Sequence, residues 1–252
     1  TMKITSSEGH DWRQWLLVSS IPLARLGEGN SLIGFGSGTM IDHSECRFIV
    51  AAEHVVQHRS TGWAAVVQQD GTGQLEYYRP NAFTYVGEVR KSTSTSRLLD
   101  LCAAQVNPKL QTWYENRTPR GLFDRQPHHV FDSGSMTCPD RNQIYGFAGL
   151  VRTERHGAST FASETVVYPG LTYSHSEEEV HHFHLPVPHP GHDAFQGCSG
   201  APIVDFNRKI VAIVVGGDTS TNSIRGVAIE RVLPNLQFLA SRSAAFQETR
   251  FN

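Results

Sequence analysis

Several features that mark particular classes of protein are scarce or missing in this sequence. Only four cysteines occur in 252 residues, with no CxxC pair and no cysteine–histidine pair at zinc-finger spacing. The longest apolar run, Ile210 to Val215, is far too short to cross a bilayer. The net charge is -2, and no dense stripe of lysine and arginine is present. We therefore expect no metal or other cofactor, no membrane partner and no nucleic-acid partner.

The amino-terminal residues, TMKITSSEGHDW, lack the apolar segment of a secretory signal peptide. If Met2 is the native start, the expected location is the cytoplasm, and the scattered cysteines fit a reducing compartment. A chain of 252 residues can bury roughly 70–75% of its unfolded surface, so it needs no disulfide or metal to hold a core.

Short apolar runs broken by turn residues dominate the chain. Most are rich in valine and isoleucine and end at glycine, proline, asparagine or aspartate, as in LLDLCAAQV and IVAIVVGG. This pattern predicts an all-β sandwich or barrel. Residues 205–209, DFNRK, predict a hairpin turn, and only residues 234–247 show helical spacing, with Pro234 in the first turn.

Two segments fit the strand pattern poorly. Residues 107–127 are the least strand-like long stretch, so they are the expected connection between two β units. Residues 173–184, YSHSEEEVHHFH, are expected to form an exposed loop that runs into a strand.

The stretch HDAFQGCSGAPIVD, residues 192–205, sets a cysteine beside a serine in a glycine frame. A nucleophile that attacks a carbonyl needs backbone N–H donors aimed at the developing oxyanion. A glycine two places before the nucleophile and another directly after it allow such a turn and leave room for substrate. Ser199 has Gly197 and Gly200 in these places, whereas Cys198 has a glutamine and a serine. Ser199 is therefore the better candidate nucleophile.

The order of the other candidate groups separates the architectures that use such a serine. An α/β-hydrolase would place its histidine after Ser199, and no histidine follows His192, which disfavours that architecture. The remaining order is histidine, aspartate, serine. His54 ends an apolar run in RFIVAAEHVV, and Asp100 heads another in DLCAAQV. Each is a polar residue where core residues are expected, as members of a catalytic triad are.

The segments that carry His54, Asp100 and Ser199, taken in this order, resemble those of the trypsin/chymotrypsin-like serine peptidases, including bacterial HtrA-like domains. The family's A-x-H segment is matched by Ala52-Glu53-His54, its D-[IL]-x-[LA] strand by Asp100-Leu101-Cys102-Ala103, and its G-x-S-G-x-P motif by Gly197 to Pro202. The likeness covers roughly residues 30 to 232, and the serine motif is its most specific part.

The resemblance implies an all-β fold of two six-stranded antiparallel β-barrels with a C-terminal helix. It implies that His54 takes the proton of Ser199, that Asp100 holds the imidazole, and that the N–H groups of Gly197 and Ser199 form the oxyanion hole. The expected domains are residues 1–110 for the barrel with the histidine and aspartate, 111–127 for the linker, 128–232 for the barrel with the serine and the specificity pocket, and 233–252 for the helix.

In this family the residue six places before the serine lies at the base of the primary specificity pocket, and here it is Asp193. A carboxylate there would favour an arginine or lysine of the substrate, because an unpaired buried charge is costly. The resemblance also implies that Gly216 and Gly226 form small pocket walls and that Val214 to Gly216 pair with the substrate backbone. The alternative is that Asp193 is an ordinary loop residue.

Three departures from the family pattern bear on activity. No I-V-G-G-type N-terminus is present, and Cys198 replaces the aspartate that receives a new amino terminus in activated zymogens. A standing active form, or ordering by a partner protein, is therefore expected rather than cleavage. Glu53 replaces a small residue, and strand alternation should turn it away from His54. Val214 stands where many relatives have a serine that bonds the aspartate.

The expected function is a serine endopeptidase that acts through an acyl-enzyme on protein or peptide substrates, cleaving after arginine or lysine, in limited or regulatory proteolysis. Two alternatives remain open. The chain could be a catalytically silent binding module of the same fold, or a peptidase that is inactive until a partner orders its loops.

A cluster of histidines precedes the serine motif. If the segment is a strand, His182 and His184 share one face, which could suit a metal. A solvated loop and strand near the rim of the cleft is the expected alternative, and His192 beside Asp193 could tune the specificity pocket. The members are His181, His182, His184, His189 and His192.

Overall fold

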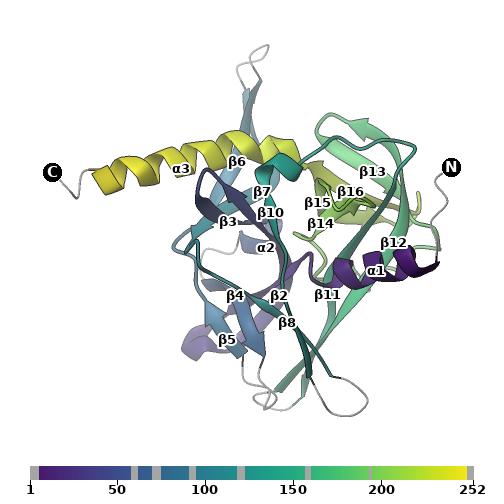
Figure 1. The fold of residues 1–252 in the computed structure, drawn as a ribbon, viewed down its shortest axis with the longest axis horizontal. Helices are drawn as coiled ribbons and strands as arrows, with labels where there is room; N and C mark the ends of the chain where they lie inside the picture. The colour runs from purple at the N-terminus through teal and green to yellow at the C-terminus, as the bar shows by residue number, and fades with distance from the viewer. Residues whose placement is uncertain are drawn as a thin grey trace.

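Two β units, one from each half of the chain, form the body of the molecule (Figure 1). The computed structural model describes residues 6–57, 62–69, 75–90, 95–117, 123–156, 160–192 and 195–248. Asp193, the residue expected at the base of the specificity pocket, lies outside the described residues.

The first unit is an antiparallel sheet that is shaped like an open barrel. Its strands follow the order β5-β4-β1-β2-β3-β7-β6. The resemblance implied six strands here, and the sheet has seven along this path, with no ladder between β5 and β6 in the described residues. Its members are β1 (Ile21–Leu26), β2 (Leu32–His43), β3 (Cys46–Ala51), β4 (Gly62–Gln69), β5 (Leu75–Tyr78), β6 (Thr84–Arg90) and β7 (Thr95–Val106).

Local sequence explains how the first sheet is connected. Ser44 and Glu45 join β2 to β3, and both have positive φ, of 48° and 63°. Two central residues of positive φ fit the right-handed twist of the flanking strands. After β3 the chain enters α2 (Glu53–Val56), a single helical turn that carries His54.

The second unit is a closed six-stranded antiparallel barrel, as expected. The strand order is β11-β12-β13-β16-β15-β14. The predicted turn at residues 205–209 joins β14 to β15, and Arg208 in it has a φ of 65°. Residues 173–184 are strand rather than exposed loop, because β12 continues through them and turns tightly into β13. The strands are β11 (Ile144–His156), β12 (Thr160–Glu177), β13 (Val180–His184), β14 (Pro202–Asp205), β15 (Ile210–Asp218) and β16 (Ser223–Ala228).

The connection between the units is not free of strands. Within the expected linker, β8 (Trp113–Arg117) pairs with β9 (Phe123–Pro127) in an antiparallel hairpin. The next strand, β10 (Val130–Asp132), pairs in parallel with β2 of the first unit. The chain therefore stays attached to the first unit until it enters the second barrel. Short helical turns in the described parts of the chain include η1 (Glu28–Asn30), η2 (Ser133–Ser135) and η4 (Ile229–Val232).

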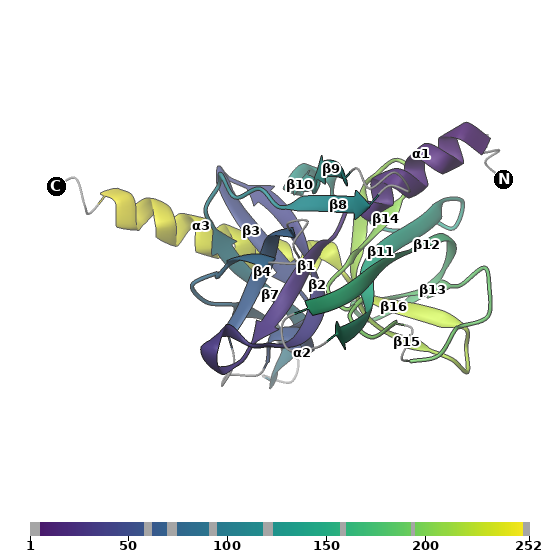
Figure 2. The same ribbon diagram turned by 90° about the horizontal axis from the view of Figure 1, so that it is seen from below.

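Each terminal helix packs on the unit at the other end of the sequence. The helix α1 (Ser6–Leu17) lies against β11 and β12 of the second barrel, and α3 (Leu233–Glu248) lies over β2 and β7 of the first unit (Figures 1 and 2). The helical spacing of residues 234–247 predicted α3, whereas α1 was not predicted. None of the described helices is long and apolar enough to span a membrane.

An apolar cluster runs between the two units and joins them. It includes Trp12 and Leu16 from α1, Phe48 from β3, Leu101 from β7 and Ile213 from β15, all at most 5% exposed. Separate clusters fill each unit. Because the shared interface is apolar, the positions of groups from the two units are fixed relative to one another.

Candidate active site

His54 and Asp100 meet at the edge of the first unit. His54 lies in α2, directly after β3, and Asp100 lies in the neighbouring strand β7. One carboxylate oxygen of Asp100 accepts the backbone N–H of His54 at 3.0 Å, and the other lies 2.7 Å from its Nδ1. Two bonds to one carboxylate fix both the backbone and the ring of the histidine. The sequence-predicted pair is therefore brought together.

The environment of His54 sets its charge. The hydrogen bond that the imidazole donates to Asp100 raises the pKa of His54, burial opposes this, and the charges of Asp100 and Glu53 add to the rise. Glu53 accepts a hydrogen bond from Gln57 at 2.8 Å. Glu53 lies on a helical turn rather than a strand, and that it turns away from His54 stays a prediction. With Nδ1 bonded to Asp100, Nε2 is the nitrogen left for a substrate or a nucleophile.

Ser199 lies on a tight turn of the second barrel that requires glycine on both sides. Gly197 has a φ of 99° and Gly200 a φ of 95°, both in the left-handed region. A Cβ on Gly197 would collide with the carbonyl of Leu150, and one on Gly200 would collide with the carbonyl of Ser37. The glycine frame that singled out Ser199 in the sequence is thus required by close backbone contacts.

Strand β2 of the first unit holds this turn in place. The Ser37 hydroxyl donates to the carbonyl of Gly197 at 2.7 Å, and the Ser37 N–H donates to the carbonyl of Ser199 at 3.1 Å. Thr39 donates its hydroxyl to the carbonyl of Gly200 at 3.1 Å. The same contacts bring the turn to α2, because a Cβ on Gly200 would lie 3.4 Å from the backbone nitrogen of Ala52. Sequence reasoning missed Ser37 and Thr39, whose role depends on pairing across the interface.

Some backbone N–H groups around Ser199 donate hydrogen bonds within the protein, and others do not. The N–H of Cys198 closes a turn to the carbonyl of Phe195 at 3.0 Å. Within the described residues, the N–H groups of Gly197 and Ser199 donate no hydrogen bond. Two available donors that flank a serine are the arrangement that stabilises a developing oxyanion.

Cys198 cannot act in place of Ser199. Its side chain is fully buried, and burial raises the pKa of its thiol to about 12. A Cβ on Gly149 would lie 2.7 Å from the Cys198 sulfur, so the thiol packs tightly against β11. A thiol with so high a pKa is not a thiolate at neutral pH, and only the thiolate is a nucleophile. Burial and a high pKa exclude Cys198, so Ser199 remains the candidate nucleophile.

The turns that carry His54 and Ser199 approach each other at Ala52 and Gly200. Among the described residues no bond joins Nε2 of His54 to the hydroxyl of Ser199. In enzymes without substrate such bonds are often long and tighten in the complex. Asp100 holds His54 on one side, and Ser37 and Thr39 hold the turn of Ser199 on the other.

The expected walls of the specificity pocket are only partly where the sequence placed them. Val214 is buried in the second barrel and bonds Gly200 and Ala201 through its backbone. A Cβ on Gly226 would lie 2.8 Å from the Cβ of Ala212, so Gly226 faces the barrel interior, and that it lines the pocket stays a prediction. A bulge between Val214 and Gly216 shifts the alternation of side chains by one residue.

Because of this bulge, Gly217 faces the region beside Phe195, and His189 fills the space next to it. The imidazole of His189 lies 4.5 Å from the ring of Phe195, and its Nε2 is buried without a partner in the described residues. Burial lowers the pKa of His189. The imidazole of His189 therefore occupies the space beside Gly217 and Phe195. Neither Gly217 nor His189 was predicted in this role.

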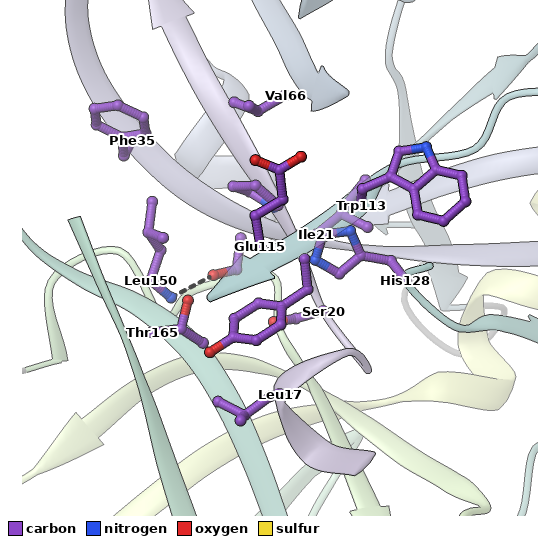
Figure 3. Close-up of a pocket in the computed structure, with 13 residues that line it drawn as sticks. Leu17, Ser20, Ile21, Phe35, Val66, Trp113, Glu115, His128, Leu150 and Thr165 are labelled. Carbon is purple, nitrogen blue, oxygen red and sulfur yellow. Dashed lines mark hydrogen bonds between the residues drawn. The ribbon is translucent and has the colours of Figure 1, made fainter. Parts of the chain in front are cut away.

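A separate cavity of about 100 Å³ lies beside Ser37 of β2 (Figure 3). Trp113 and His128 lie on one side of it, and Phe35 and Leu150 on the other. It contains neither His54 nor Ser199, so it is not the candidate active site. It adjoins the site through Ser37, whose hydroxyl accepts the N–H of Leu150 at 3.2 Å, and through Leu150, whose carbonyl lies against Gly197.

The described residues contain no group of three or more histidine, cysteine, aspartate or glutamate side chains arranged to hold a metal. His182 stacks on His175 of β12, with ring centroids 4.5 Å apart and an angle of 9° between the rings. His181 is buried, and its Nδ1 lies 2.7 Å from the hydroxyl of Ser176. The cluster is therefore divided between the two faces of β13.

Comparisons with known proteins bear on the fold. No protein-family model matches the chain, and no curated protein sequence matches it. A serine endoprotease from Yersinia pestis is 12% identical, with a TM-score of 0.54, over 95% of this chain and 68% of the other. Neuropsin, a serine protease of mouse brain, is 12% identical, with a TM-score of 0.54, over 89% and 96%.

A human heparin binding protein is also similar, at 10% identity and a TM-score of 0.53, over 89% of this chain and 92% of the other. The strand order, the closed second barrel, the C-terminal helix and these similarities agree with one another. The chain therefore has the double β-barrel fold of the trypsin/chymotrypsin-like serine proteases.

Proposed function

We propose that the protein is a serine endopeptidase in which Ser199 is the nucleophile, His54 the general base and Asp100 the residue that orients His54. The observation that carries the proposal is the combination of two preformed halves. One is the pair of His54 and Asp100, which two hydrogen bonds join. The other is the turn that carries Ser199, in which two backbone N–H groups are available as donors. The fold adds that similar solved structures are serine proteases.

The proposed reaction follows from these groups. The Ser199 oxygen attacks the carbonyl carbon of the substrate, and its proton passes to Nε2 of His54. Asp100 retains the proton on Nδ1, so that Nε2 is the basic nitrogen and the imidazolium is stabilised. The N–H groups of Gly197 and Ser199 bind the oxyanion. His54 then gives the proton to the departing amine. In the second half of the reaction His54 takes a proton from water, the water oxygen attacks the acyl carbon, and the Ser199 oxygen leaves with the proton from His54.

The contacts of the serine turn favour a standing active form over one that a partner must order. Both sides of the turn are already bonded to β2, and the hydroxyl of Ser37 holds the carbonyl of Gly197. In this site Cys198 anchors the turn by packing, in the place of the ion pair that activated zymogens form.

A preference for arginine or lysine before the scissile bond remains a proposal, and it rests on Asp193 alone. The substrate backbone would pair with the edge of β15 beyond Val214, which is the edge that adjoins the Ser199 turn.

Turnover of a denatured peptide library tests the function, with cleavage sites read by mass spectrometry. The unaltered protein should cleave the library, Ser199→Ala should lose up to about 10⁶-fold in kcat, and Cys198→Ser should retain the cleavage pattern. Loss of cleavage in Cys198→Ser with full activity in Ser199→Ala would reverse the choice of nucleophile. No cleavage by the unaltered protein, together with retained peptide binding, would support the silent binding module.

A further inference from the structure

A row of basic side chains crosses the outer face of the second barrel and ends at the candidate substrate edge. His175 of β12 pairs with His182 of β13, His182 pairs with Arg225 of β16, and Arg225 pairs with Gly216 of β15. Residues directly opposite one another in antiparallel strands place their side chains on the same face. The row therefore leads across four neighbouring strands to Gly216.

The Arg225 guanidinium lies over Gly216. A Cβ on Gly216 would lie 3.2 Å from Nη2 of Arg225, so the absence of a side chain at Gly216 leaves this space to the arginine. The side chain of Arg225 is exposed, and within the described part of the chain its guanidinium forms no hydrogen bond or ion pair. An exposed cation that no neighbouring carboxylate holds is available for a ligand.

The edge of β15 next to this cation is open. On one side β15 pairs with β16 as far as Asp218, and on the other β14 pairs with it only as far as Ile213. The backbone of Val214 bonds the turn that follows Ser199. From residue 215 onward the described residues provide no strand on that side. A peptide that added there antiparallel to β15 would run toward Ser199, so its residues along Gly216 precede the scissile bond.

We propose that Arg225, supported by His182, forms a subsite for an aspartate or glutamate on the amino-terminal side of the scissile bond, at the residue opposite Gly216. This inference rests on the proposed peptidase function, because it takes the β15 edge as the substrate site. A guanidinium binds a carboxylate through two parallel hydrogen bonds, which an ammonium cannot do. The subsite is separate from the primary pocket, so it is compatible with arginine or lysine directly before the scissile bond.

The charges around His182 determine how the subsite responds to pH. Burial lowers the pKa of His182, the charges of His175 on β12 and Arg225 on β16 lower it further, and Glu177 on β12 and Asp218 on β15 act in the opposite direction. Asp218 is engaged by Ser220, whose N–H and hydroxyl both donate to it. Arg225 therefore supplies the charge at neutral pH, and protonation of His182 adds to it as the pH falls.

Peptide binding to the Ser199→Ala variant, measured by fluorescence polarisation, tests the subsite. The probes are matched peptides that carry glutamate or glutamine at each of the four positions before the cleaved bond. Glutamate at one position should bind about three- to fivefold more tightly at low salt, as expected for an exposed ion pair, and the difference should shrink in high salt. Arg225→Gln should abolish the difference without weakening the glutamine peptide.

A matched control and a charge reversal complete the test. Arg141 is an exposed arginine in the turn before β11, and Arg141→Gln should leave the preference unchanged. Arg225→Glu should favour lysine at the same position. Equal binding of the two peptides, retention of the preference in Arg225→Gln, or failure of every peptide to bind would overturn the subsite.

The peptidase and the subsite can fail separately. Arg225-dependent binding of glutamate peptides without cleavage by the unaltered protein would refute the peptidase and keep the subsite. Cleavage that is indifferent to glutamate at all four positions would keep the peptidase and refute the subsite.

Discussion

Replacement of Asp100 by asparagine separates the catalytic role of this residue from its structural role. An asparagine keeps the size of the side chain, and its amide oxygen can still accept the N–H of His54. It cannot both accept from the backbone and keep the charge that favours a proton on Nδ1. The structure therefore predicts a histidine in the same place with the wrong nitrogen protonated.

The expected magnitudes differ strongly for stability and for rate. The side chains of His54 and Asp100 are 44% and 33% exposed, so the pair should contribute only about 0.2–1 kcal/mol to folding. The expected loss in kcat is about 10⁴-fold, as in other triads, which corresponds to about 5 kcal/mol in the activation barrier. A loss of rate that exceeds the loss of stability by several kcal/mol identifies an orienting role.

The pH dependence of stability and of activity tests the orienting role of Asp100 independently. Because Asp100 raises the pKa of His54, the pair stabilises the fold at low pH, and this contribution is lost as the pH rises through the raised pKa. Activity has the opposite dependence, since the base must be neutral, so kcat/KM rises through the same pKa. In Asp100→Asn the acid limb should move to lower pH. Steady-state kinetics between pH 4 and 9 with urea unfolding on the same samples would measure both, and an unchanged kcat/KM and acid limb would refute the reasoning.

Four further predictions concern the support of the site. Ser37→Ala removes the hydroxyl that fixes the carbonyl of Gly197, so kcat should fall roughly tenfold with little change in KM; a change confined to KM would contradict this. Gly149→Ala places a methyl group 2.8 Å from Cα of Cys198 and should cost about 1–3 kcal/mol in unfolding free energy, which thermal denaturation would detect. In the folded protein iodoacetamide should modify exposed Cys138 and spare Cys198, whose thiol pKa is raised to about 12; rapid modification of Cys198 would show that the turn opens. Burial lowers the pKa of His128 to about 4, so stability should fall by about 3 kcal/mol from pH 7 to pH 4, and His128→Gln should flatten this dependence in urea titrations.

The sequence predicted the parts of the site that depend on local chemistry. The glycines around Ser199 could be interpreted because each is needed for a backbone conformation and a close contact that other residues do not allow. The order of His54, Asp100 and Ser199 supported the family resemblance from which the fold was predicted. The turn at residues 205–209 and the C-terminal helix followed from turn residues and helical periodicity.

Features that depend on packing between distant segments could not be predicted in this way. Trp12, Trp15 and Leu16 have the spacing of a helical apolar face, but the adjoining run WLLVSSIPL resembles a strand, so α1 was missed. One bulge in β15 turns the expected pocket wall Gly216 toward Arg225 and turns Gly217 toward His189. The glycines in IVAIVVGGD are typical of a bulge, but they do not give the residue at which it falls, and a one-residue shift moves every following side chain to the other face.

The central claim is that Ser199 is a nucleophile because His54 activates it across the interface of the two barrels. Intact-mass analysis after treatment with a fluorophosphonate tests this most directly, with the adduct located by peptide mapping. The account predicts one adduct, on Ser199, which persists in Cys198→Ser and is lost in His54→Ala. No adduct on the folded protein, or equal labelling of Ser199 in His54→Ala, would contradict it.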